Sequence, residues 1–95
     1  MEDEEEGRLV VYNTGLYDEL WEDKEGLTHR LNGPAVIYAG GDTIWYKHGK
    51  LHRENGPARE WPHDDVEEWY KDGKPYEPSA HELMLWKMKK MKKEC

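Results

Sequence analysis

Short runs of apolar and aromatic residues alternate with turn-forming residues over most of the chain. The runs are rich in β-branched and aromatic side chains and are too short for helices, so they predict β-strands. Six runs fall into three consecutive pairs: Leu9–Tyr12 with Leu16–Trp21, Ala35–Ala39 with Thr43–Lys47, and Ala58–Trp61 with Val66–Lys71. The linkers NTG, GG and PHDD contain residues typical of turns. The pattern predicts a mainly β fold, an antiparallel meander of about three repeated hairpins.

The pattern changes after Pro78, where one C-terminal α-helix is predicted. Ser79 and Glu82 have the spacing of a capping box, with Ser79 as the N-cap and Glu82 reaching back. We expect the helix to run to about Lys92 and to cover an open end or face of the sheet. The expected division of the chain is an acidic leader (residues 1–7), a hairpin sheet (8–78) and a Lys-rich helix (79–95).

The hairpins are related by a sequence repeat. Trp21, Trp45 and Trp69 follow one another at intervals of 24 residues, and the phrase His-Arg-x-Asn-Gly-Pro-Ala begins at both His29 and His52. A repeat of this length is typical of arrays whose units bury their apolar faces against neighbours. We expect the tryptophans to stack across the strands as an aromatic ladder. The ladder is either a shared core column or an exposed stripe for a partner.

The repeated phrase predicts a turn that is built twice. Its turn residues are Asn32, Gly33 and Pro34 in the first copy and Asn55, Gly56 and Pro57 in the second. Asn-Gly favours a turn because both residues tolerate a positive φ, and a proline that follows can start the next strand. The His-Arg pair can bond backbone carbonyls or neighbouring acids such as Glu54. The alternative is a His/Arg surface that binds an acidic or phosphate ligand.

The segments GKLHRENGPA and WYKDGK resemble the MORN-like repeats of phage and bacterial proteins, which share the phrase HRxxGPA. The resemblance covers about Trp21 to Lys74. It implies a curved β-hairpin sheet used as a binding scaffold, often in a small phage protein. Strict MORN repeats have His-Gly where this chain has His29-Arg30 and His52-Arg53, so their lipid binding is not carried over.

Composition and charge restrict the classes of partner. The 95 residues suffice for one domain with a thin core, because only 36% are hydrophobic while 37% are charged. Residues 1–25 contain ten acids and two bases, and the chain has a net charge of −7. This charge disfavours direct nucleic-acid binding and an anionic membrane surface, and it favours a basic protein surface. The lone cysteine, Cys95, permits no internal disulfide, and no apolar signal segment follows Met1, so we expect a cytoplasmic protein.

The sequence predicts neither an enzyme nor a cofactor or metal site. The one serine is assigned to a helix cap and the one cysteine lies at the terminus, so no nucleophile is paired with a base. His48 and His52 are separated by a turn, and His63-Asp64-Asp65 offers only a weak cation site.

We therefore expect a non-enzymatic protein-binding module, in its sharper form a small acidic phage-encoded protein. Such a protein would bind and inhibit a host protein, such as a defence or nucleic-acid-handling factor, in the bacterial cytoplasm. The alternatives are a structural homo-oligomer joined through open sheet edges and a peripheral membrane protein associated through its helix. The residues expected to contact the partner are Trp61, Asp64, Asp65, Glu67, His52 and Arg53.

Overall fold

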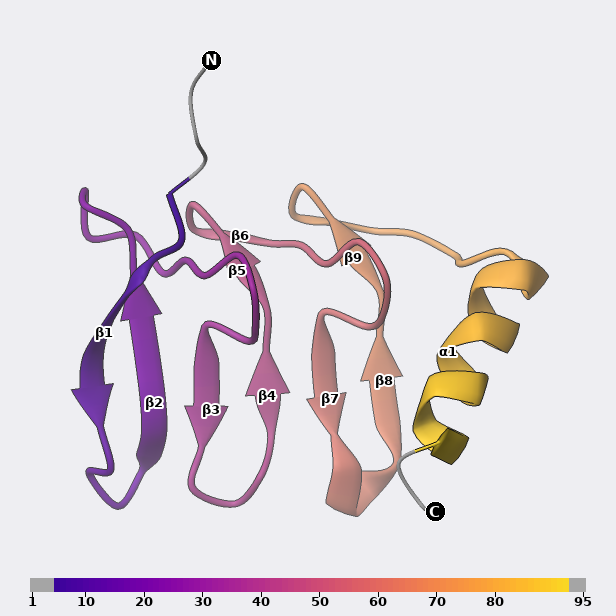
Figure 1. The fold of residues 1–95 in the computed structure, drawn as a ribbon, viewed down its shortest axis with the longest axis horizontal. Helices are drawn as coiled ribbons and strands as arrows, with labels where there is room; N and C mark the ends of the chain where they lie inside the picture. Colours follow the sequence, from indigo (N-terminus) through magenta and orange to yellow (C-terminus); the bar gives the residue numbers. More distant parts are fainter. Residues whose placement is uncertain (1–4, 93–95) are drawn as a thin grey trace.

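The computed structural model describes residues 5–92 and confirms a mainly β fold with a single C-terminal helix (Figure 1). A six-stranded antiparallel sheet has the order β1-β2-β3-β4-β7-β8. Its strands follow one another in chain order, with β5 and β6 set aside in a separate small sheet, so the fold is a meander. Its strands are β1 (Arg8–Tyr12), β2 (Tyr17–Glu22), β3 (Val36–Tyr38), β4 (Thr43–Ile44), β7 (Arg59–Trp61) and β8 (Val66–Glu68). The three predicted hairpins are β1–β2, β3–β4 and β7–β8.

Two small hairpins lie at the end of the sheet opposite the turns of the large ones (Figure 1). They are β5 (Tyr46–Lys47) with β6 (Lys50–Leu51), and β9 (Tyr70–Lys71) with β10 (Lys74–Pro75). Their turns are His48-Gly49 and Asp72-Gly73, in which both residues have a positive φ. A turn with a positive φ at both central residues is a type I′ turn, whose twist matches that of the two strands it joins. In the described structure the second and third repeats therefore each contain a large and a small hairpin, β3–β4 with β5–β6 and β7–β8 with β9–β10.

The strand register defines two faces of the sheet. Leu20, Val36, Ile44, Arg59 and Glu68 lie opposite one another in one row. Because side chains alternate along a strand, the adjacent row projects to the other side; it contains Glu19, Ile37, Thr43, Glu60 and Glu67. We name the side with the first row the tyrosine face, after Tyr17 and Tyr38, whose rings stack on it. We name the other the tryptophan face, after the repeated tryptophans.

The core is thin, as the composition predicts. The buried apolar residues are Ala35, Val36, Ile44, Ala58, Trp69 and Trp86. The largest fully buried side chains are His29, Asp23 and Pro57, two of which are polar. A core with this composition depends on hydrogen bonds that satisfy its polar groups.

Helix α1 (Ala80–Lys92) begins at the predicted capping box and covers the β8 end of the array (Figure 1). The backbone N–H of Ser79 donates to Oε1 of Glu82 at 2.8 Å, and the N–H of Glu82 donates to Oγ of Ser79 at 3.1 Å. Trp86 is 7% exposed, and its ring meets that of Trp69 edge-on at 6.4 Å. The helix therefore covers an open end of the sheet, one of the two positions expected from the sequence.

The predicted ladder of stacked tryptophans is wrong in its contacts. Within the described residues, Trp21 and Trp45 do not stack on each other or on Trp69; arginines from the repeated phrase cover them instead. Cζ of Arg30 lies 3.9 Å from the Trp21 ring centroid, and Cζ of Arg53 lies 4.0 Å from that of Trp45. An arginine over an aromatic ring gains an electrostatic attraction that a second tryptophan lacks.

The predicted positive φ in the Asn-Gly dipeptides is also wrong. Residues 31–33 and 54–56 do form bends, but neither Gly33 nor Gly56 is among the positive-φ glycines. Each glycine instead makes room for an arginine. A Cβ on Gly33 would lie 2.9 Å from Cζ of Arg30, and a Cβ on Gly56 would lie 2.8 Å from Cζ of Arg53. Both distances are shorter than real Cβ contacts, so close side-chain packing selects glycine here.

Candidate functional site

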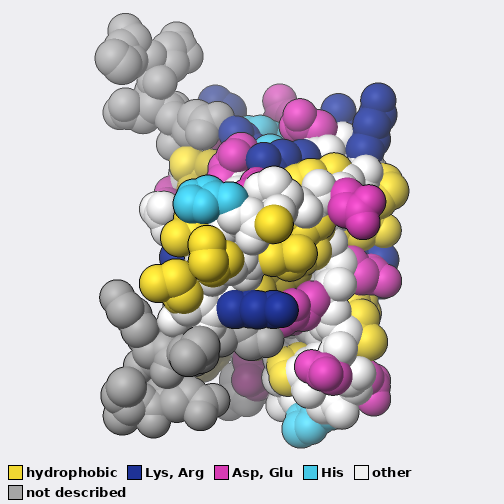
Figure 2. Space-filling model, turned by 90° about the vertical axis from the view of Figure 1, so that its right-hand side faces the viewer, with side chains coloured by type: hydrophobic (Ala, Val, Ile, Leu, Met, Phe, Trp, Pro, Cys, Tyr) yellow, Lys and Arg dark blue, Asp and Glu magenta, His cyan; other side chains and the backbone are white. Residues whose placement is uncertain are grey.

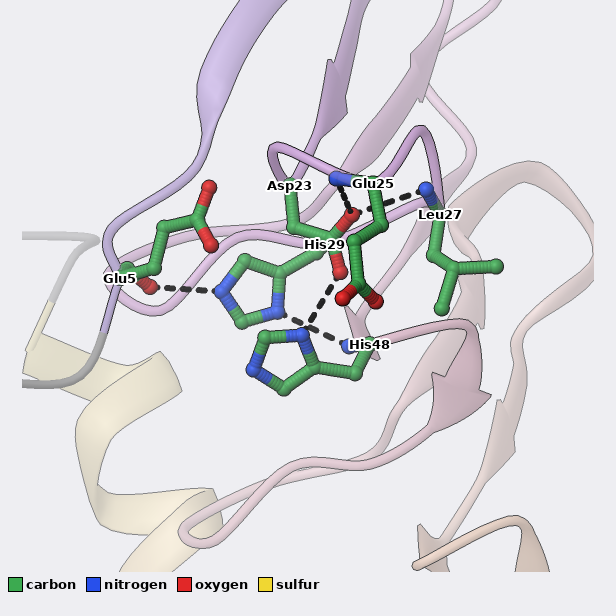
Figure 3. A network of polar contacts seen from close by, with 6 residues as sticks. All are labelled: Glu5, Asp23, Glu25, Leu27, His29 and His48. Carbon is green, nitrogen blue, oxygen red and sulfur yellow. Dashed lines mark hydrogen bonds and ion pairs between the residues drawn. The ribbon is translucent and has the colours of Figure 1, made fainter.

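The histidine of the first repeated phrase joins three parts of the chain (Figure 3). His29 is fully buried, and its ring stacks on that of His48 with the centroids 4.0 Å apart. Its Nδ1 accepts a hydrogen bond from the backbone N–H of His48 at 2.9 Å. Because Nδ1 is the acceptor, Nε2 carries the hydrogen and donates to the backbone carbonyl of Glu5 at 2.6 Å. His29 thus connects the acidic leader to the turn of the next small hairpin.

The leader makes further contacts with the same phrase. The backbone N–H of Leu31 donates to the carbonyl of Glu6 at 3.0 Å, and the side chain of Asn32 donates to Oε1 of Glu6. Gly7 passes so close that a Cβ there would lie 2.5 Å from the carbonyl oxygen of His29. The last part of the leader is therefore held by the first repeat, while residues 1–4 lie outside the described part of the chain.

Asp23 is the second buried polar side chain of this network (Figure 3). Its Oδ1 accepts the backbone N–H groups of Glu25 and Leu27, both at 2.9 Å. Its Oδ2 accepts a hydrogen bond from Nδ1 of His48 at 2.7 Å. The hydrogen bond from His48 is the main cause that holds the pKa of Asp23 below its ordinary value; desolvation opposes it, and the two backbone donors assist it. One carboxylate thereby fixes two turns.

His52 has the corresponding role in the second repeat. Its Nδ1 accepts the backbone N–H of Asp72 at 3.0 Å, and its Nε2 donates to Oε2 of Glu54 at 2.8 Å. His48 and Asp72 are both positive-φ residues in the small-hairpin turns. Each repeated histidine therefore stabilises the turn that follows it. Tyr76 occupies the equivalent position in the third unit, where the array ends.

The guanidinium of Arg53 is enclosed on several sides. It donates to the carbonyl of Pro57 at 3.0 Å and to Oε1 of Glu60 at 3.4 Å, and it lies 4.9 Å from the ring centroid of Trp86. Burial lowers the pKa of Arg53 from its ordinary value, while Glu60 opposes this effect. With its side chain only 17% exposed, Arg53 mainly holds the second repeat and α1 together.

The six residues expected to bind a partner fall into two groups. Trp61, Asp64 and Asp65 lie together, around the short helix η1 (Pro62–Asp64) between β7 and β8. Trp61 is half-buried under Arg59, whose Cζ is 4.7 Å from its ring centroid, and both aspartates are exposed. These three residues are therefore accessible to a partner at one end of the sheet.

The other three residues contact their own chain. Oε2 of Glu67 accepts a hydrogen bond from Nε1 of Trp86 at 3.1 Å, on the tryptophan face. His52 and Arg53 also lie away from Trp61 and make the internal contacts described above. The structure thus does not bring the six residues into one surface, because Trp61 and Glu67 belong to opposite faces of the sheet.

An open groove of about 460 Å³ lies on the tyrosine face beside Trp61. It contains residues from all three large hairpins: Gly15, Leu16, Tyr38, Ala39, Gly40, Asp42, Ile44, Arg59 and Trp61. The Nε2 of His63 contacts the carbonyl of Gly40 at 3.0 Å, which ties η1 to the groove. Burial, together with the nearby Tyr17, raises the pKa of Tyr38 above its ordinary value. Of the groove residues, only Trp61 was predicted from the sequence to bind a partner. The others come together only because separate hairpins pair in the sheet.

A smaller apolar pocket of about 210 Å³ lies between α1 and the second repeat. Trp69, Leu85 and Met88 form its apolar walls, and Glu54 and Lys89 are among its polar residues. Figure 2, which views the molecule from the α1 side, shows hydrophobic side chains gathered on this surface. Leu85 and Met88 are 46% and 50% exposed, so the outer side of the helix keeps an apolar strip.

The chemistry available to these groups is narrow. Asp23 orients His48 as a carboxylate orients a catalytic histidine, but within residues 5–92 no hydroxyl or thiol contacts the other ring nitrogen. The described residues also contain no group of three or more potential metal ligands. Among the described helices, none has both the length and the apolar character needed to span a membrane.

Comparison of the chain with protein-family models, with curated proteins and with solved structures finds no match. We therefore infer function from the geometry of the residues.

Proposed function

We propose that the chain is a non-enzymatic protein-binding module whose partner presents a basic surface. The groove on the tyrosine face carries the proposal. It combines half-buried aromatic side chains, Tyr38 and Trp61, with the 62% exposed Leu16. Amphipathic aromatic residues of this kind are enriched in protein-binding surfaces, because they offer a large apolar area and a polar edge.

The charges around the groove favour a basic partner. Asp42 lines it, and Asp64 and Asp65 follow Trp61 in the adjoining η1 segment. None of the three has an ion-pair partner among the described residues. Arg59 is the basic residue of the groove, and it is already paired with Glu68 at 3.3 Å. Carboxylates without partners and a net charge of −7 steer positively charged surfaces toward the molecule.

In its more specific form, the proposal is a small phage-encoded protein that inhibits a host defence or nucleic-acid-handling factor in the bacterial cytoplasm. The phage context rests on the resemblance of the repeats, and the inhibitory role rests on the acidic character. An acidic surface competes with nucleic acid for the same basic residues of a host protein.

Affinity capture from bacterial lysate tests the proposal. The wild-type chain should retain a protein at about 0.05 M salt and lose it at about 0.5 M, because screening weakens contacts between exposed charges. An Asp64→Asn, Asp65→Asn double variant should lose the same protein at low salt. Asp65 has a φ of 55°, and asparagine tolerates this conformation, so the fold should persist.

A matched control removes two exposed acids elsewhere on the chain, as Asp18→Asn with Glu77→Gln. This variant should retain the partner. Equal loss in both double variants would show that overall charge, not the groove, causes capture. Absence of a retained protein at either salt concentration would reject the binding function.

A further inference from the structure

The two ends of the repeat array differ in whether another element packs against them. At the β8 end, α1 places Trp86 against Trp69 and Arg53, where the next repeat of a longer array would pack. At the other end, β2 is the one strand within residues 5–92 that pairs with β1, and Figure 1 shows no described element outside β1. Among the described residues, one edge of the sheet is therefore covered by α1 and the other edge, β1, has no covering element.

The open edge is apolar. Leu9 is 43% exposed, Val10 is 40% exposed and Tyr12 is 67% exposed, although β1 also contributes to the sheet. β1 contains no proline, and its one charged residue is Arg8 at the start. Natural proteins usually protect an edge strand with charges, proline or a covering element, since its free N–H and C=O groups can pair with another chain. In the described structure, β1 has Arg8 and a bulge near Val10 as features that protect an edge strand.

We propose that β1 pairs antiparallel with β1 of a second copy of this chain, so that two sheets join edge to edge. The sequence RLVVY is compatible with such a two-fold contact. With the axis near Val10, Arg8 of each copy lies near Tyr12 of the other, and apolar residues occupy the middle. Like charges are thus kept apart, and each arginine meets an aromatic side chain.

The proposed contact uses β1, none of whose residues lines the groove, and α1 lies at the opposite end of the array. A dimer would present two copies of the groove, and two linked sites raise the effective affinity for a partner that has two matching surfaces. Dimerisation also differs from the proposed binding function in its response to salt. Two copies with a charge of −7 repel each other, so screening should leave the dimer intact or strengthen it, whereas it should weaken binding to a basic partner.

Sedimentation and light scattering of the full chain test the proposal. The wild type should have twice the chain mass of 11.3 kDa at high concentration. Val10→Lys should be monomeric, because two lysines would meet at the two-fold axis. The matched control is Val66→Lys on β8, where the valine is 36% exposed at the edge beside α1. This control should remain dimeric. A monomeric wild type, or equal loss of the dimer in both variants, would overturn the proposal.

Substitutions at Tyr12 separate dimerisation from folding. Tyr12 lies opposite Glu19 within the chain and near Arg8 of the second copy in the proposed dimer. Tyr12→Arg should preserve or raise the melting temperature through Glu19, yet weaken the dimer on the order of tenfold by facing the two Arg8 residues. Tyr12→Glu should do the reverse in both measurements. If both variants change the dimer constant in the same direction, the two-fold pairing is refuted.

Discussion

Substitution of Gly56 by alanine tests the packing of the repeated phrase. The new Cβ would lie 2.8 Å from Cζ and 2.9 Å from Nε of Arg53, whereas ordinary contacts begin at 3.4 Å. The guanidinium would have to move, although the Trp45 ring and the Pro57 carbonyl hold it on other sides. Loss of the cation–π contact costs about 0.5–2 kcal/mol, and loss of the hydrogen bond costs about 0.5–1.5 kcal/mol. We expect unfolding to become easier by about 1–3 kcal/mol.

A double-mutant cycle gives the decisive measurement. Urea unfolding, followed by circular dichroism, should be measured for the wild type, Gly56→Ala, Arg53→Ala and the double variant. If the guanidinium is the reason for the glycine, Gly56→Ala should cost less than about 0.5 kcal/mol once Arg53 is alanine. An equal cost in both backgrounds would refute the packing explanation and point to the backbone instead.

Two other glycines serve as controls for that cycle. Gly40 has open space around its Cβ position and no positive φ, so Gly40→Ala should leave stability unchanged or slightly higher. Gly73 has a φ of +82° in the turn of a small hairpin. Gly73→Ala should therefore cost about 1 kcal/mol, whether or not Arg53 is present.

Two further predictions concern Asp23 and Ser79. The pKa of Asp23 is lower in the folded chain than in the unfolded chain, so its carboxylate contributes stability above the unfolded value, near 3.8, and that contribution is lost as the pH falls through the folded value. Asp23→Asn should thus reduce the urea midpoint at pH 7 and match the wild type in strong acid; a constant difference at all pH values would contradict the assignment. Ser79→Ala should cost about 1 kcal/mol and shorten α1 by circular dichroism, whereas Ser79→Asp should retain the cap. Equal helix content in both variants would argue against the capping role.

The strands and the helix were predictable from the sequence because local signals specify them. Alternating apolar residues and turn dipeptides located β1 to β5 and β7 to β9, and the spacing of Ser79 and Glu82 located the start of α1. The runs Thr43–Lys47 and Val66–Lys71 were predicted as single strands, but each divides into two strands that belong to different sheets. The repeat also predicted that units are equivalent, which the matching roles of His29 and His52 illustrate. These features depend on residues that are close together in the chain, so a single sequence contains them.

The candidate site was predictable only in part. Trp61, Asp64 and Asp65 adjoin one another in sequence and remain together in the structure. Tyr38 and Leu16 join the groove only because β2, β3 and β4 pair in a particular register. No spacing in the sequence carries that information, since register depends on contacts between distant strands.

Tertiary structure also decided what the repeated phrase does. The sequence alone specified that a bend forms at each Asn-Gly, since both copies contain the same turn residues. Whether Gly56 is needed for its backbone angle or for the space it leaves depends on where Arg53 packs. Likewise, the hydrogen bond from the backbone of His48 to the ring of His29 joins residues 19 positions apart. Such contacts arise only when neighbouring units pack, because each thin unit completes its core and its hydrogen bonds with groups from the next.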